Sequence, residues 1–107
     1  MTLRIAVVIP CYKVKRQIRR VLSEIGPEVE RIFVIDDACP ERTGDWLRHK
    51  IDDPRVSIHI LTKNIGVGGA VISGYRLALD AGMDVVVKVD GDGQMDPSLI
   101  PRFLLPI

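Results

Sequence analysis

The residues best suited to chemistry follow a run of valines, in the segment VVVKVDGDGQMDP at 85–97. Asp90 and Asp92 are separated by one glycine, so in an extended chain both carboxylates point the same way. Gln94 adds a neutral oxygen, and the glycine after each aspartate lets the backbone approach a ligand closely. This sparse oxygen set suits Mg²⁺ or Mn²⁺ that is also held by water and substrate phosphates. An EF-hand loop is excluded, because its twelfth position would be Pro101 instead of glutamate. The alternative to a metal site is a turn that caps the next helix.

A second acidic pair, Asp36 and Asp37, closes another apolar run. One interpretation is an Asx-type turn that caps the next helix. The other is a ligand role, in which a carboxylate accepts a hydrogen bond from a base N–H or a ribose hydroxyl. The pattern leaves both interpretations open.

The segment NIGVGGAVISGY at 64–75 is glycine-rich but matches neither GxGxxG nor a P-loop. Its small residues at i, i+4 spacing favour close packing of a helix on a sheet. The glycines at positions 66, 68 and 69 also leave room for a ligand, and Gly68 is taken as a candidate binding residue.

The elements that must position these residues alternate along the chain. Four apolar runs rich in β-branched residues predict strands at 3–10, 31–36, 55–61 and 84–90. Helical periodicity predicts helices at 14–25, 41–50 and 69–81, and Asp96-Pro97 suits the start of a fourth. The βαβαβαβα order predicts an α/β, Rossmann-like sheet of parallel strands. The polar residues follow the strands, at the edge where such sheets bind ligands.

Two positively charged features have specific interpretations. Lys88 lies on the same side of its predicted strand as Asp90, which indicates a structural ion pair. The first predicted helix carries Lys13, Lys15, Arg16, Arg19 and Arg20. These cations form either a solvated face or a surface attracted to an anionic membrane or a lipid phosphate.

Composition narrows the class of protein. The 107 residues form at most one small domain, and 47% apolar with 27% charged residues is typical of a globular protein. A net charge of +1 and few aromatic residues give no case for nucleic-acid binding. Cys11 and Cys39 form no CxxC pair, so a reducing, cytoplasmic setting is expected. The C-terminal segment stops within a predicted helix, so a fragment of a longer protein is expected.

With these motifs in view, the chain resembles the N-terminal half of a family 2 glycosyltransferase with the GT-A fold. It is similar to the polyprenyl or dolichyl phosphate mannose and glucose synthases. Four segments carry the resemblance in order across 1–107: VVIPCYK, VIDDACPERTGDWL, NIGVGGAVISGYRLA and VDGDGQMDPSLIPRFL. The last contains the DXD pattern.

The resemblance implies a role for each matching residue. Pro10 and Tyr12 would line the nucleotide pocket, and Asp37 would hydrogen-bond the base while Asp36 supports that turn. Asp90 would lie near the ribose and the diphosphate. Asp92 and Gln94, together with Asp90, would hold Mg²⁺ or Mn²⁺. That cation would neutralise the charge of the departing nucleoside diphosphate.

The implied reaction is transfer of a sugar, with inversion, from a UDP- or GDP-linked donor to an acceptor such as a polyprenyl phosphate. The catalytic base would lie beyond Ile107. The full-length protein would be associated with the cytoplasmic face of a membrane. The fragment alone would bind the donor weakly without turnover. The family's Asn-Glu is replaced by Lys13-Val14, and its Gly-Ser by Ala38-Cys39, which puts those contacts in question.

Two alternatives come from other classes. A receiver-type signalling domain would carry its acidic pair after the first strand, where Pro10, Cys11 and Tyr12 stand. A non-catalytic nucleotide-binding module would keep the fold without turnover.

Overall fold

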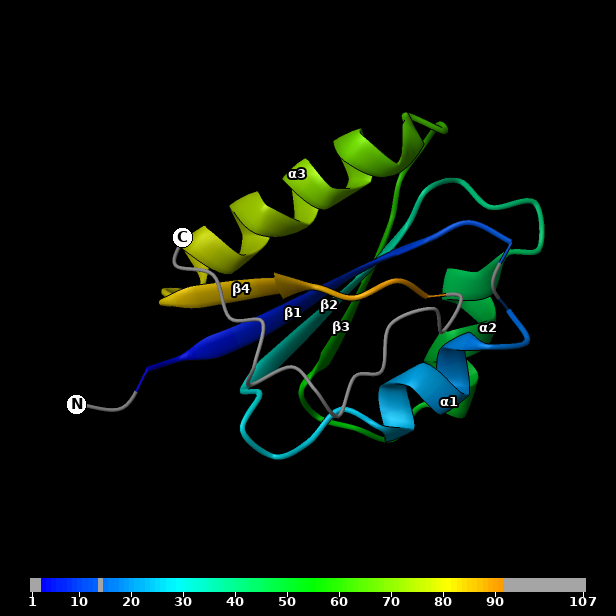
Figure 1. Cartoon of the computed structure of the whole chain (residues 1–107). Helices are drawn as coiled ribbons and strands as arrows, with labels where there is room; N and C mark the ends of the chain where they lie inside the picture. The colour runs from blue at the N-terminus through cyan, green and yellow to red at the C-terminus, as the bar shows by residue number, and fades with distance from the viewer. Residues whose placement is uncertain (1–2, 14, 92–107) are drawn as a thin grey trace.

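The computed structural model describes residues 3–13 and 15–91. Its element order is a regular alternation of strand and helix (Figure 1). The strands are β1 (Ile5–Cys11), β2 (Arg31–Asp36), β3 (Val56–Ile60) and β4 (Val85–Lys88). The helices are α1 (Ile18–Ser23), α2 (Thr43–Lys50) and α3 (Gly66–Asp80). The predicted fourth helix at Pro97 lies outside the described residues.

All strand pairs are parallel, in the order β3-β2-β1-β4, which confirms the predicted α/β class. The chain steps from β1 to β3 in one direction and then returns to the other side of β1 with β4. The strand order therefore reverses at the carboxyl end of β1, which is the place where open α/β sheets bind ligands.

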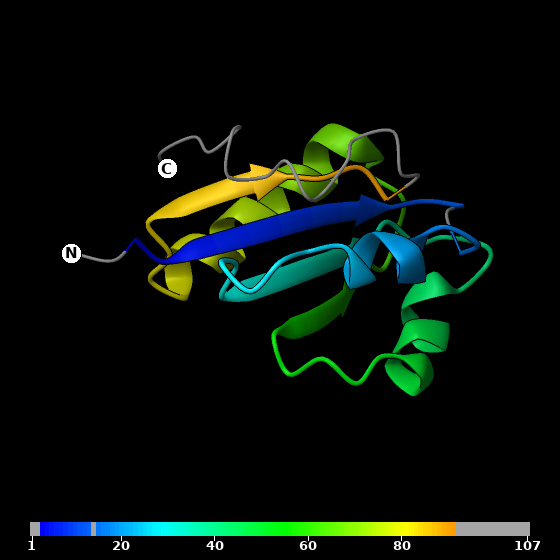
Figure 2. The ribbon, with the colours of Figure 1, turned by 60° about the horizontal axis from the view of Figure 1, so that its bottom comes forward.

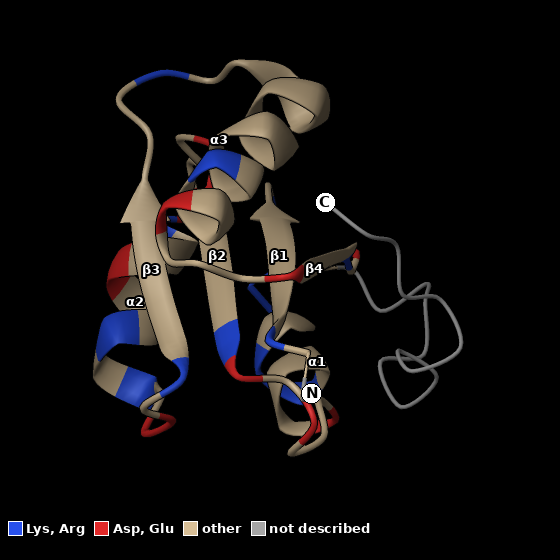
Figure 3. Ribbon diagram, turned by 90° about the vertical axis from the view of Figure 1, so that its left-hand side faces the viewer, with Lys and Arg blue, Asp and Glu red and all other residues tan. Residues whose placement is uncertain are grey.

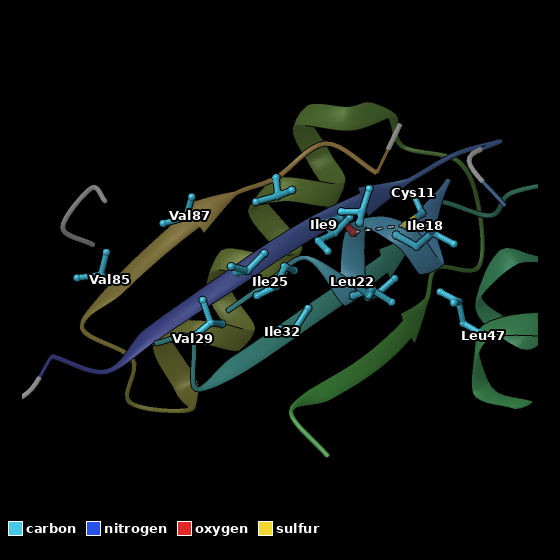
Figure 4. Close-up of a cluster of buried hydrophobic side chains, with 14 residues drawn as sticks. Ile9, Cys11, Ile18, Leu22, Ile25, Val29, Ile32, Leu47, Val85 and Val87 are labelled. Carbon is cyan, nitrogen blue, oxygen red and sulfur yellow. Dashed lines mark hydrogen bonds between the residues drawn. The ribbon is translucent and has the colours of Figure 1, made fainter. Parts of the chain in front are cut away.

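The sheet is covered on both faces, which explains why β1 and β2 are almost continuously apolar. The α1 and α2 helices cover one face, and α3 covers the other (Figures 1 and 2). The side chains of β1 alternate between two cores: Val7 and Ile9 pack with Ile18 and Leu47 on the α1/α2 side (Figure 4). The residue between them, Val8, belongs to the core beneath α3.

Close packing of α3 explains its small-residue stripe, as predicted. Ala70, Gly74 and Ala78 are its buried residues, and a Cβ on Gly74 would collide with the side chain of Val8. Within the described residues, no helix combines the length and the apolar composition that a bilayer span requires.

All three described helix starts differ from the prediction, that of α2 by two residues, at Thr43 instead of Glu41. The α1 helix begins at Ile18 instead of Val14, because residues 15–17 form a turn after β1. The α3 helix begins at Gly66, three residues before the predicted start. Glycines are poor helix formers, so periodicity alone did not include this first turn. Hydrogen bonds to Asp37, the residue after β2, fix it, as described below.

Candidate functional site

The exits of the first three strands meet at one edge of the sheet. Cys11 of β1 is in register with Asp36 of β2, and Asp36 is in register with Ile60 of β3. Beyond the strands, the Asp37 N–H donates to the carbonyl of Cys11 at 3.0 Å. Three loops distant in sequence are thereby brought together.

A cavity of about 340 Å³ lies at this edge. Its lining comes from the ends of β1 and β2 and from the start of α3: Pro10, Cys11, Tyr12, Asp37, Asn64, Gly66 and Val67. Three of these residues, Pro10, Tyr12 and Asp37, were predicted to bind a nucleotide. The Tyr12 side chain is exposed, so its ring is available to stack on a planar ligand.

Asp37 is the buried charge of this cavity, with 3% of its surface exposed. Its Oδ1 accepts from the N–H of Ile65 at 2.8 Å, and its Oδ2 accepts from the N–H of Gly66 at 2.9 Å. The Asn64 side chain donates to the same Oδ2 at 3.1 Å. These bonds compensate the buried carboxylate and cap the first turn of α3. A carboxylate accepts about four hydrogen bonds, so capacity for a ligand donor remains.

Asp36 does not line the cavity, because consecutive residues at the end of a strand point to opposite sides. Its Oδ1 accepts from the N–H of Cys39, and its Oδ2 accepts from the N–H of Gly44, both at 2.8 Å. The Asp36 carboxylate therefore holds the turn before α2. This geometry fits the turn-and-cap interpretation and the supporting role that the resemblance implied.

Two residues beside the cavity adopt left-handed backbone conformations. Lys13 has φ 59° and Ala38 has φ 55°, values that side chains other than glycine and asparagine rarely adopt. These are the positions at which the family pattern has asparagine and glycine. The turn at Lys13 is fixed by its N–H, which donates to Sγ of Cys39 at 3.0 Å.

Cys11 and Cys39 are buried and free. Burial raises the pKa of the Cys11 thiol, and the nearby Asp36 and Cys39 raise it further. The protonated thiol is a poor nucleophile. Cys11 therefore acts in the cavity as a small apolar wall.

The carboxyl end of β4 lies beside that of β1, since Val89 donates to the carbonyl of Val8 at 3.0 Å. Asp90 follows, and its Oδ1 pairs with Nζ of Lys88 at 3.2 Å, which confirms the predicted ion pair. Asp92 and Gln94 lie outside the described residues. Among residues 3–13 and 15–91, no three His, Cys, Asp or Glu side chains cluster as a metal site would. The predicted metal ligands remain a prediction.

Of the three glycines that were expected to leave room for a ligand, Gly66 lines the cavity; the binding role of Gly68 stays a prediction. Gly66 has φ +86°, which strains any other residue, whereas a Cβ on Gly68 would meet no atom within 4 Å. Cys11, Asn64 and Val67 were also missed as site residues. Asn64 lies between β3 and α3, and Gly66 is the first residue of α3; their place after the carboxyl end of a strand was the signal for them.

Comparison with known proteins identifies the family of the chain. A family model described as glycosyl transferase family 2 matches residues 6–107. An undecaprenyl-phosphate mannosyltransferase from Micrococcus luteus is 36% identical over 105 residues, covering 95% of this chain and 43% of the relative. A dolichol-phosphate mannosyltransferase from Pyrococcus furiosus is 29% identical over 95% of this chain and 29% of its own length. The chain thus spans less than half the length of these relatives.

Solved structures support the fold. A mannosyltransferase from Pyrobaculum calidifontis, in complex with GDP-Man and Mn²⁺, aligns with a TM-score of 0.73 at 22% identity over 86% of this chain and 28% of its own. S. aureus TarS in complex with UDP-GlcNAc aligns with a TM-score of 0.65 at 22% identity over 84% of this chain and 27% of its own. The parallel sheet with alternating helices is thus the arrangement found in GT-A glycosyltransferases.

Proposed function

The chain belongs to glycosyltransferase family 2, and we propose that it forms the donor-binding part of an enzyme that moves a sugar from a nucleotide diphosphate sugar to a polyprenyl phosphate. The observation that carries this proposal is the cavity that Tyr12 and Asp37 both line. It lies at the edge of the sheet where the strand order reverses. The names of the relatives support the acceptor class, since they include undecaprenyl-phosphate and dolichol-phosphate transferases.

The base of the donor would occupy the cavity, with its ring against Tyr12 and Pro10. Asp37 would accept a hydrogen bond from a base N–H. Its carboxylate is already fixed by donors from Ile65, Gly66 and Asn64. Recognition therefore needs no further ordering of that side chain, which lowers the entropic cost of binding.

The diphosphate would lie toward β4, where Asp90, Asp92 and Gln94 would hold Mg²⁺ or Mn²⁺. These ligands fit such an ion, because the side chain of Asp90 is partly exposed and its carboxylate oxygens are hard ligands. A bound ion supplies Lewis-acid stabilisation of the departing diphosphate. Lys88 keeps a positive charge beside the same carboxylate, and this charge also favours an anionic phosphate group nearby.

The acceptor phosphate would attack the anomeric carbon from the face opposite the diphosphate, which inverts the configuration. A lipid acceptor implies that the whole protein works at a membrane, and we place the donor site on its cytoplasmic face. Two buried free cysteines support a reducing compartment.

Titration with GDP, UDP, GDP-Man and UDP-GlcNAc, with and without Mn²⁺, tests donor binding. We expect Mn²⁺ to strengthen binding, and Asp92→Ala to remove that gain. Tyr12→Ala should weaken binding about tenfold through lost stacking, while Tyr12→Phe, which keeps the ring, should retain it. Binding that ignores both Mn²⁺ and Asp92→Ala would refute the proposal. Sugar transfer to polyprenyl phosphate by the full-length protein separates an enzyme from a non-catalytic nucleotide-binding module.

A further inference from the structure

A second hollow lies away from the nucleotide cavity, between α1 and α2. It encloses about 520 Å³ and is lined by four cations and one aromatic residue: Lys15, Arg16, Arg19, Arg20 and Trp46. We refer to these five residues as the basic groove. The two helices lie on the face of the sheet opposite α3 (Figure 2), so the groove is separate from the strand-end contacts of Asp37.

The charge of the groove is local, because the whole chain is nearly neutral. Residues 13–20 contain five of the 15 Lys and Arg residues and no acidic residue. Elsewhere, opposite charges are mixed: on α2, Asp45 pairs with Arg42 and Arg48, and Figure 3 shows red and blue segments side by side. A face that serves only solubility needs no such segregation of one sign.

The cations of the groove are available to a ligand. Within the described part of the chain, none of the four forms an ion pair within 4.0 Å. One carboxylate lies beside the groove: Glu41 accepts from the backbone N–H of Lys15, at 3.4 Å. Its single negative charge offsets only one of the four cations, so the groove keeps an excess of positive charge.

Trp46 gives the groove an amphipathic floor. Its ring packs partly against the core beneath α1 and α2, and Nζ of Lys15 lies 5.3 Å from the ring centroid. Tryptophan beside lysine and arginine suits a membrane–water interface, where the indole lies at headgroup level and the cations reach lipid phosphates. Four cations also exceed what one phosphate monoester, with at most about two charges, would require.

We propose that the basic groove docks this face of the protein onto an anionic lipid surface, with Arg16, Arg19 and Arg20 on lipid phosphates and Trp46 at the headgroup boundary. This proposal goes beyond the donor site, because it assigns a second surface and its partner. It also orients the molecule. Tyr12 of the nucleotide cavity lies three residues before Lys15, so the cavity would open close to the bilayer.

The test compares binding of this chain to vesicles of phosphatidylcholine alone and of phosphatidylcholine with about one third phosphatidylglycerol. Trp46 is the single tryptophan of the chain, so its emission reports directly from the groove. The variant pair is Arg16→Ala/Arg19→Ala and, as a matched loss of two exposed cations on the α3 side, Lys63→Ala/Arg76→Ala. Donor affinity is measured for each variant, so failure of docking and failure of the donor site are separated.

We expect binding to anionic vesicles only, with a shift of Trp46 emission to shorter wavelength and weakening as salt rises. Arg16→Ala/Arg19→Ala should bind about 30-fold more weakly, whereas the control pair should stay within about twofold. Equal binding to both kinds of vesicle, or an unaffected Arg16→Ala/Arg19→Ala variant, would overturn the proposal. So would displacement of the vesicles by inorganic phosphate at millimolar concentration, since the groove would then be a site for small anions.

Discussion

Replacing Asp37 by asparagine tests the central contact of the site. Its two carboxylate oxygens accept hydrogen bonds from the N–H groups of Ile65 and Gly66, at 2.8 and 2.9 Å. The residue is buried, with 3% of its surface exposed. Asparagine keeps one oxygen but turns an NH₂ group toward one of these donors. One charge-assisted hydrogen bond is lost, and one buried N–H is left without an acceptor. The free energy of unfolding should fall by about 3 kcal/mol.

The measurement is urea unfolding followed by the fluorescence of Trp46, with amide hydrogen exchange as a second readout. Asp90→Asn is the matched control, because its ion pair with Lys88 is partly exposed and should be worth only about 0.5 kcal/mol. We also expect faster exchange at Ile65 and Gly66 in Asp37→Asn. If the two variants unfold at the same urea concentration and exchange at these amides is unchanged, the capping role of Asp37 is refuted.

Three further predictions concern the stability of the fold. Ala38→Gly should raise the free energy of unfolding by about 1 kcal/mol, since φ is 55° there, whereas Ala81→Gly, where φ is −82°, should lower it in the same urea titration. Because burial raises the pKa of the Cys11 thiol, the free energy of unfolding should fall as the pH rises above 9.0, the ordinary pKa of a cysteine. Cys11→Ala should reduce this dependence of stability on pH. The same pH dependence in both proteins would contradict the assignment. Asp53 has its pKa lowered, chiefly by the hydrogen bond from Arg55, so its stabilisation is present above the ordinary pKa of 3.8 and is lost as pH falls through the lowered value. Asp53→Asn should cost about 0.5–1 kcal/mol at neutral pH and nothing in acid, as unfolding titrations at both pH values would show.

The fold could be predicted from the sequence because its strands are long apolar runs. The predicted strand at 31–36 coincides with β2. The predicted ends of the other three strands lie one or two residues from the ends in the structure. Helix starts were less accessible. The first turn of α3 depends on Asp37, which lies 29 residues before Gly66, and no local pattern contains that contact.

The site was accessible only in part, for two physical reasons. Alternation along a strand indicates that Asp36 and Asp37 face opposite ways, but it does not say which one faces the cavity. Likewise, the glycines of α3 could not be ranked. Which glycine borders the cavity depends on the rotation of the helix, and the capping contact sets that rotation. The sequence therefore pointed to Gly68, whereas the glycine that lines the cavity is Gly66.

The double duty of Asp37 has an evolutionary consequence. In the proposed donor site, the carboxylate that contacts the base also holds two secondary-structure elements together. A lineage that changes it to accept another base therefore loses folding stability at the same time. Tyr12 and Val67 also border the cavity, and both are exposed. Divergence in donor choice among descendants of this sequence should accumulate at those two positions, with the aspartate left untouched.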